Sequence, residues 1–239
     1  MAEGMFPFPE WPQVALRRSS RARSLRLRLD ARRGGFVLSA PARASLAALR
    51  EFLAQHRGWM EGQAAGHVPV ILRGEGEVIP FHGRELQVWR TGHLRGVVEI
   101  ADGKLLVPGE AASCARRVFD FLRQQARRDI VPLVHEKAKA AGASFRRISF
   151  RDQRSRWGSC SADGGLSFSF RLVMTPPEVM DYVVAHEVAH LLHHHHGPDF
   201  WEACARLSIS PDIRTCRAWL KRHGAGVQAI GIDGVGARA

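Results

Sequence analysis

The sequence lacks the features that mark membrane-inserted and secreted proteins. No apolar run approaches the roughly 20 residues that cross a bilayer. The first residues, Met1 to Trp11, show no basic segment followed by an apolar stretch. Cysteine is scarce: the four cysteines are widely spaced and form no Cys-x-x-Cys pair, which is typical of a reducing compartment. We therefore expect a cytoplasmic protein without membrane contact.

Acidic residues are few relative to basic ones, with 23 Asp and Glu against 35 Lys and Arg and a formal net charge of +12. Arginine carries most of the excess and falls in two clusters: Arg17, Arg18, Arg21, Arg23, Arg26, Arg28, Arg32 and Arg33, and then Arg146, Arg147, Arg151, Arg154 and Arg156. Such a surface attracts nucleic acid, nucleotides or acidic proteins, and it is equally typical of a solvated face in an arginine-rich chain. The charge by itself names no substrate.

The first half of the chain has the patterning of a β-rich region. Leucine and arginine alternate over residues 24–30, and Gly34-Gly35 then turns the chain into residues 36–40, which predicts a hairpin. Apolar residues at helical spacing predict an amphipathic helix over residues 44–60. Three short segments separated by glycines predict further antiparallel sheet: 84–90, 97–100 and 105–107.

The second half is richer in helix. A long helix is predicted from Cys114 to Ala141, and Pro132 is expected to kink or break it. The other expected elements are two strands, 148–150 and 166–172, and two helices, 198–207 and 211–224.

These elements predict an α+β protein. The expected divisions are an N-terminal extension (1–20), a β-rich N-terminal lobe (21–110), a catalytic lobe (111–224) and a disordered tail (225–239).

The most informative segment is His186-Glu187-Val188-Ala189-His190, which lies in a predicted helix capped by Thr175 and Glu178. Histidines four residues apart lie one above the other on a helix, so both imidazoles can reach one ion. Glu187 is rotated about 100° from His186 and stands beside the ion, where it can take a proton from a zinc-bound water. The pattern predicts a catalytic zinc site with two ligands identified.

A catalytic zinc needs a third protein ligand and one open position. His193 shares the face of the first two histidines but stands about 10 Å along the axis from His186, too far to converge on the same ion. The chain must therefore leave the helix before the third ligand, and His196, just before Gly197-Pro198, is favoured. The alternatives are His194, His195 and Glu202.

Several motifs in the same order resemble the YgjP-like metallopeptidase family, from about residue 21 to residue 224. The motifs that carry the resemblance are Arg156-Trp157-Gly158-Ser159-Cys160, the segment 177–184, the His-Glu-x-x-His helix and His196-Gly197-Pro198-Asp199-Phe200-Trp201. The resemblance implies a zincin-like catalytic domain related to SprT-like proteases, with its active-site helix beside a small antiparallel sheet. It also implies His186, His190 and His196 as zinc ligands and Glu187 as the base.

The Arg-Trp-Gly-Ser-Cys segment has two interpretations. In one, Arg154, Arg156 and Ser159 border the metal cleft together with Trp157 and hold an anionic group or a developing oxyanion of the substrate. In the other, Trp157 fills the core beside the zinc helix. Cys160 is expected to be a small buried hydrophobe rather than a ligand.

Three functions are compatible with these residues. The first is a metallopeptidase that acts on a peptide or protein and binds it as a strand added beside residues 166–170. The second is a metal-dependent nucleoside triphosphate pyrophosphatase of UTP type, which the arginines favour because phosphates need cationic clamps. The third is a DNA-associated zinc protein that uses the arginine clusters for nucleic-acid contact. We rank the peptidase first.

Overall fold

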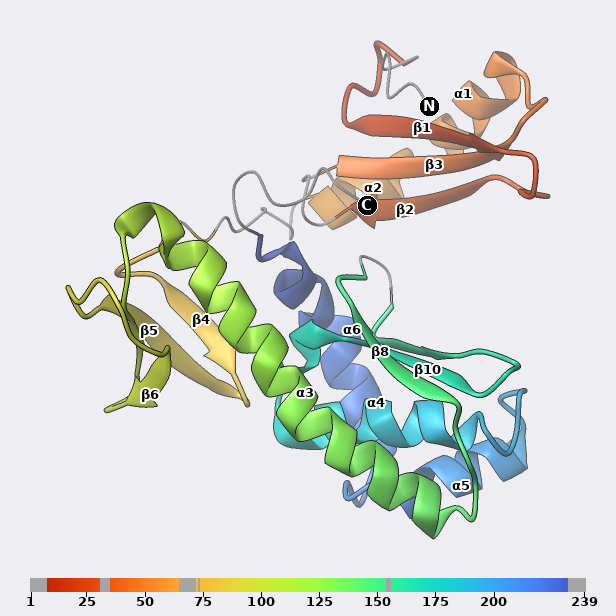
Figure 1. Ribbon diagram of the computed structural model, residues 1–239. Helices are drawn as coiled ribbons and strands as arrows, with labels where there is room; N and C mark the ends of the chain where they lie inside the picture. The colour runs from red at the N-terminus through yellow and green to blue at the C-terminus, as the bar shows by residue number, and fades with distance from the viewer. Residues whose placement is uncertain (1–7, 31–34, 65–71, 73, 154–155, 232–239) are drawn as a thin grey trace. The chain divides into compact units, whose positions relative to one another are not determined.

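The computed structural model of the 239-residue chain describes residues 8–30, 35–64, 72, 74–153 and 156–231 (Figure 1). Contacts between residues divide the chain into two compact units: residues 1–71 with 228–231, and residues 72–227 with 232–239. Helices and small sheets occur together, so the predicted α+β class is confirmed. The division falls after residue 71 and not after residue 110 as expected, because the second sheet contacts the long helix that follows it. In the described part, no helix is long and apolar enough to cross a membrane.

The first unit contains a three-stranded sheet in the order β1-β3-β2, with β1 at Val14–Ser19, β2 at Arg26–Asp30 and β3 at Gly35–Pro41. The predicted hairpin is confirmed, since β2 and β3 pair antiparallel from Arg26 opposite Ser39 to Asp30 opposite Gly35. Residues 14–19, which the sequence analysis placed in an N-terminal extension, form β1 and pair parallel with β3. The alternation of apolar and polar residues in β1 is short, and nothing in the sequence indicates that this segment pairs with β3.

The helix expected over residues 44–60 is two helices, α1 (Leu46–Gln55) and α2 (Arg57–Ala64). Ser45 caps α1 by accepting a hydrogen bond from the Ala48 N–H at 3.2 Å. His56 interrupts the helix at φ −100° and ψ 10°. The apolar spacing continues across this break, so periodicity alone did not report it. Leu49 and Leu53 of α1 pack with Phe36 and Leu38 of β3 in the core of this unit.

The second unit begins with a four-stranded sheet in the order β4-β5-β7-β6. Its strands are β4 (Val78–Phe81), β5 (Arg84–Arg90), β6 (Glu99–Ala101) and β7 (Lys104–Val107). The expectation of a wholly antiparallel sheet was wrong, because β5 and β7 pair in parallel. The second strand of the β6–β7 hairpin pairs with β5. The alternation of apolar and polar residues does not indicate which strands are neighbours in a sheet.

Helix α3 (Cys114–Ala140) packs against helix α4 (Pro177–Ala189), which contains His186 and Glu187, and against the 3-10 helix η2 (Phe170–Met174). Figure 1 shows α3 as one continuous helix, so Pro132 does not break it. A proline removes one helical hydrogen bond. The buried apolar side of α3 outweighs that loss; its members include Val118, Leu122, Ile130 and Val134.

The sheet beside α4 has the order β8-β10-β9, formed by β8 (Arg147–Arg151), β9 (Gly158–Cys160) and β10 (Gly165–Ser169). It is mixed rather than antiparallel, since β10 runs parallel to β8 and antiparallel to β9. The strand expected over residues 166–172 ends at Ser169, whose hydroxyl accepts a hydrogen bond from the Arg171 N–H and starts η2. Because β10 is paired on both sides, it has no free edge for a substrate strand.

Two further helices follow α4: α5 (Pro198–Leu207), as predicted, and α6 (Ile213–Ala229). Gly224 does not end α6 as expected; a Cβ there would lie 3.2 Å from Cζ2 of Trp157, so the glycine permits close packing. The prediction that Thr175 caps α4 was wrong. The Thr175 hydroxyl donates to the Leu172 carbonyl at 2.7 Å, and Pro176 is the residue that precedes the first turn of α4. Helix α6 includes the first residues of the expected tail, and residues 232–239 lie outside the described part.

Candidate metal centre

Three histidines meet at the carboxyl end of α4. The helix ends at Ala189 with His190 as its C-cap, so the chain leaves the helix axis before His196, as the spacing argument required. One ligand atom each from His186, His190 and His196 lie within 4.8 Å of one another. The Nε2 atoms of His186 and His196 are 3.2 Å apart. The other histidines of the run are not part of this group.

The three imidazoles fit a zinc ion. Ligands at about 2.0–2.1 Å from a tetrahedral zinc lie roughly 3.3 Å apart, close to the observed separation of His186 and His196. The Nδ1 atom of His190 lies 3.1 Å from the His193 carbonyl, which fixes the ring and leaves Nε2 free for an ion. Burial, together with the neighbouring histidines and Arg217, lowers the pKa of His186 to about 4. The ring is therefore neutral near pH 7, which is the form that binds metals.

Glu187 lies beside the histidines with a buried side chain that is 6% exposed. Burial raises the pKa of its carboxyl to about 7, against the opposing effects of the Arg156 charge and a hydrogen bond from the Cys160 backbone N–H. The carboxylate is thus held by β9, the strand next to α4. A group with this pKa can both accept and release a proton near neutral pH.

Gly158 of β9 is the residue that makes room for this carboxylate. A Cβ at position 158 would lie 2.5 Å from Cγ and 2.7 Å from Oε1 of Glu187. Real Cβ atoms do not approach so closely, so any other residue would displace Glu187 or the strand. The glycine of the Trp-Gly-Ser motif therefore has a packing role that spacing could not reveal.

The remaining predicted substrate-binding residues are placed unequally. Arg156 is exposed and its charge acts on Glu187, so it lies near the site. Ser159 is half-buried in β9 opposite Ser167, and no contact with the histidines is observed. Trp157 packs against Gly224 of α6, which favours its interpretation as a packing residue. Arg154 lies outside the described residues.

The family of the chain follows from its sequence over most of its length. Residues 23–223 match the family described as YgjP-like, metallopeptidase domain. The chain belongs to this family. Membership places it among metallopeptidases, hydrolytic enzymes that use a metal ion, usually zinc.

Two solved structures are similar to part of the chain. The metallopeptidase zymogen jannalysin of Methanocaldococcus jannaschii shares 16% identity at a TM-score of 0.34, covering 39% of this chain and 94% of that chain. The metallopeptidase zymogen abylysin of Pyrococcus abyssi shares 19% identity at a TM-score of 0.35, covering 43% and 98%. A comparison with curated proteins finds no match.

Three further residues of this YgjP-like chain border the histidines, and the sequence analysis assigned a role to none of them. The guanidinium of Arg217 in α6 lies 4.6 Å from the ring centre of Trp201 in α5. That ring lies 5.5 Å from the ring of His196. Tyr182 lies one turn before His186, with 5.9 Å between the rings, and burial raises its pKa to about 12. Trp201 belongs to the motif that follows His196, so the sequence offered a reason to examine it. No neighbouring residues of Arg217 indicate that it lies near the histidines.

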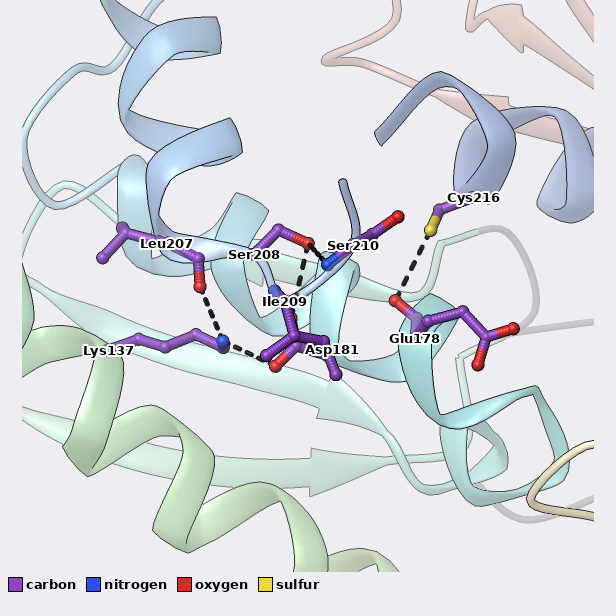
Figure 2. A network of polar contacts seen from close by, with 8 residues as sticks. All are labelled: Lys137, Glu178, Asp181, Leu207, Ser208, Ile209, Ser210 and Cys216. Atoms are coloured by element: carbon purple, nitrogen blue, oxygen red, sulfur yellow. Dashed lines mark hydrogen bonds and ion pairs between the residues drawn. The ribbon is translucent and has the colours of Figure 1, made fainter. Parts of the chain in front are cut away.

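A buried ion pair joins α4 to the surrounding elements (Figure 2). Lys137 of α3 and Asp181 of α4 are 2.6 Å apart, and both side chains are 2% exposed. Lys137 also donates to the Leu207 carbonyl at 2.7 Å, and Asp181 accepts from the Ile209 N–H at 2.8 Å. The network ties α3 and α4 to the end of α5 and the loop that follows, at the other end of the helix from the histidines.

The Gly158→Ala variant is expected to lower kcat by about 10²-fold while the metal content stays unchanged. The added methyl group displaces the carboxylate of Glu187, the base that the sequence predicts, and small misplacements of a catalytic group have effects of this size. Peptide hydrolysis and metal analysis of the same preparation measure the two quantities. Gly226→Ala is the control, because no atom lies within 4 Å of a Cβ at that position. Wild-type activity in Gly158→Ala would contradict the role of Gly158 in making room for the Glu187 carboxylate.

Proposed function

We propose that the protein is a zinc metallopeptidase in which His186, His190 and His196 hold the ion and Glu187 is the general base. The observation that carries this proposal is the convergence of three imidazoles beside a buried carboxyl group in a chain of a metallopeptidase family. Glu187 is rotated about the helix axis away from His186 and His190, so its carboxylate lies beside the ion and next to the coordination position left for water.

When bound, zinc would polarise the scissile carbonyl and lower the pKa of a water molecule to about 7. Glu187 accepts the proton of the attacking water and passes it to the leaving amine. The Cys160 N–H and Gly158 hold the carboxylate in position for both transfers. Burial keeps the pKa of Glu187 high enough for the second transfer.

The edge of β9 is the proposed place for the substrate backbone, in place of β10. The Trp157 carbonyl accepts from Ser169, and the Ser161 N–H donates to Gly165, so these residues face β10. Backbone groups alternate along an antiparallel strand, which leaves Gly158 and Cys160 facing the other way. The Cys160 N–H already serves Glu187, and the carbonyls of both residues remain for a substrate strand.

The ligand set is tested by replacing single histidines. His196→Ala is expected to weaken zinc binding at least about 100-fold, because three ligands are the minimum for a catalytic site. Competition with a chromogenic chelator measures the dissociation constant. His194→Ala and His195→Ala are the matched controls and are expected to bind zinc as the wild type does. If one of these controls loses zinc binding while His196→Ala does not, the histidine replaced in that control is the third ligand instead of His196.

Two other activities predicted from the sequence stay predictions. The exposed Arg156 beside Glu187 favours an anionic group, so nucleoside triphosphates belong in every activity assay as a second substrate class. Nucleic-acid contact would fall on the first unit. Among the residues that the structure describes there, the guanidinium groups of Arg21, Arg23, Arg26 and Arg28 form no ion pair.

A further inference from the structure

An arginine beside the proposed metal centre has no acidic partner. Within the described part of the chain, Arg217 forms no ion pair and no side-chain hydrogen bond. Its charge nevertheless acts on His186 and on Tyr182, so it lies close to the histidine group.

Trp201 holds this guanidinium in place. The guanidinium carbon lies 4.6 Å from the ring centre of Trp201, and the ring lies 5.5 Å from His196 and 5.9 Å from His186. Stacking on an aromatic face orients the planar group while its N–H donors remain free at the edge. The arginine is therefore preorganised next to the histidines and still able to bind a planar anion through two hydrogen bonds.

The charges around the centre favour an anion at this position. Arg156 acts on Glu187 from one side, and Arg217 acts on His186 from α6. Glu187 lies within reach of both charges, but among the described residues no carboxylate forms an ion pair with Arg217. Cations gathered without a counter-ion raise the local concentration of anionic ligands. A carboxylate of the substrate would supply the missing charge.

We infer that Arg217 is a specificity-determining residue that binds a carboxylate of the peptide substrate, so that the enzyme prefers an acidic group close to the bond it cleaves. This inference rests on the proposed peptidase function. The carboxylate belongs either to an Asp or Glu side chain or to the C-terminus of the peptide. Both groups present the same planar pair of oxygens. Peptides with an amidated C-terminus distinguish them, because amidation removes only the terminal carboxylate.

The experiment begins with a peptide library digested by the zinc-loaded protein, with the cleaved bonds identified by mass spectrometry. We expect Asp and Glu, or a free C-terminus, to be enriched at one position within three residues of the cleaved bond. For a matched peptide pair with Glu or Gln at that position, or with a free or amidated C-terminus, we expect kcat/KM to favour the acidic form at least about 10-fold. In Arg217→Gln this ratio falls to near 1, and Arg217→Lys keeps part of it because lysine retains the charge without the planar fork.

Controls separate this inference from the proposed function. Arg222→Gln, an exposed arginine of the same helix, keeps the wild-type ratio, and equal zinc content in Arg217→Gln shows an intact centre. In the Glu187→Gln background, peptide binding measured by fluorescence anisotropy shows the same acidic preference without turnover. Cleavage without any acidic preference, or a preference that survives in Arg217→Gln, overturns the inference alone. No peptide cleavage by the wild type contradicts the proposed function, and the inference falls with it.

Discussion

Replacement of Glu187 with glutamine is expected to lower kcat for peptide hydrolysis by about 10²–10⁴-fold, the usual contribution of a general acid-base group. Glutamine has nearly the same shape, and its carbonyl oxygen can still accept the hydrogen bond from the Cys160 N–H that the carboxylate accepts now. It cannot take a proton from water. The loss therefore isolates proton transfer from packing, which matters because Glu187 also touches Gly158.

The measurement compares wild type and Glu187→Gln, each loaded with zinc and matched in metal content. Unfolded protein, a peptide library and a panel of nucleoside triphosphates serve as substrates. We expect peptide cleavage by the wild type and its loss in the variant at unchanged zinc content. Equal cleavage by both proteins would remove Glu187 from the mechanism. Release of pyrophosphate without peptide cleavage would favour the nucleotide function instead.

The second large effect is expected on stability. Lys137→Met leaves Asp181 charged and buried without its cation, and breaking a buried pair in this way destabilises proteins by about 3–5 kcal/mol. The free energy of unfolding, from chemical denaturation followed by circular dichroism, measures the loss. Because the network links α3, α4 and the loop after α5, the variant is also expected to expose α4 to proteolysis.

A double variant is the control for this prediction. Lys137→Met with Asp181→Asn removes both charges, and the asparagine oxygen can still accept from the Ile209 N–H. We expect the double variant to recover much of the lost stability, since a neutral buried group costs far less than an unpaired ion. A single variant as stable as the wild type would show that Asp181 is not held by Lys137.

The local elements of the chain follow largely from its sequence. Alternation over residues 24–30 predicted β2, the proline at 198 predicted the start of α5, and histidine spacing predicted that α4 ends before His196. These features depend on neighbours within a few residues, so they are visible in a short window. Pairing was less visible: the parallel β5–β7 pair and the inclusion of β1 in the first sheet join segments that no periodicity connects.

The candidate site shows the same division. By itself, the sequence determined that two histidines lie on one face of a helix with Glu187 beside them, because helix geometry is local. The same geometry predicted that a third ligand would come from beyond the helix. Only the tertiary structure decided that Gly158 borders the carboxylate, that Arg217 lies over Trp201 and that Lys137 meets Asp181. Each of these contacts joins residues far apart in the chain. Packing of α3, β9 and α6 around the site creates them, and no local pattern records which distant side chains such packing brings together.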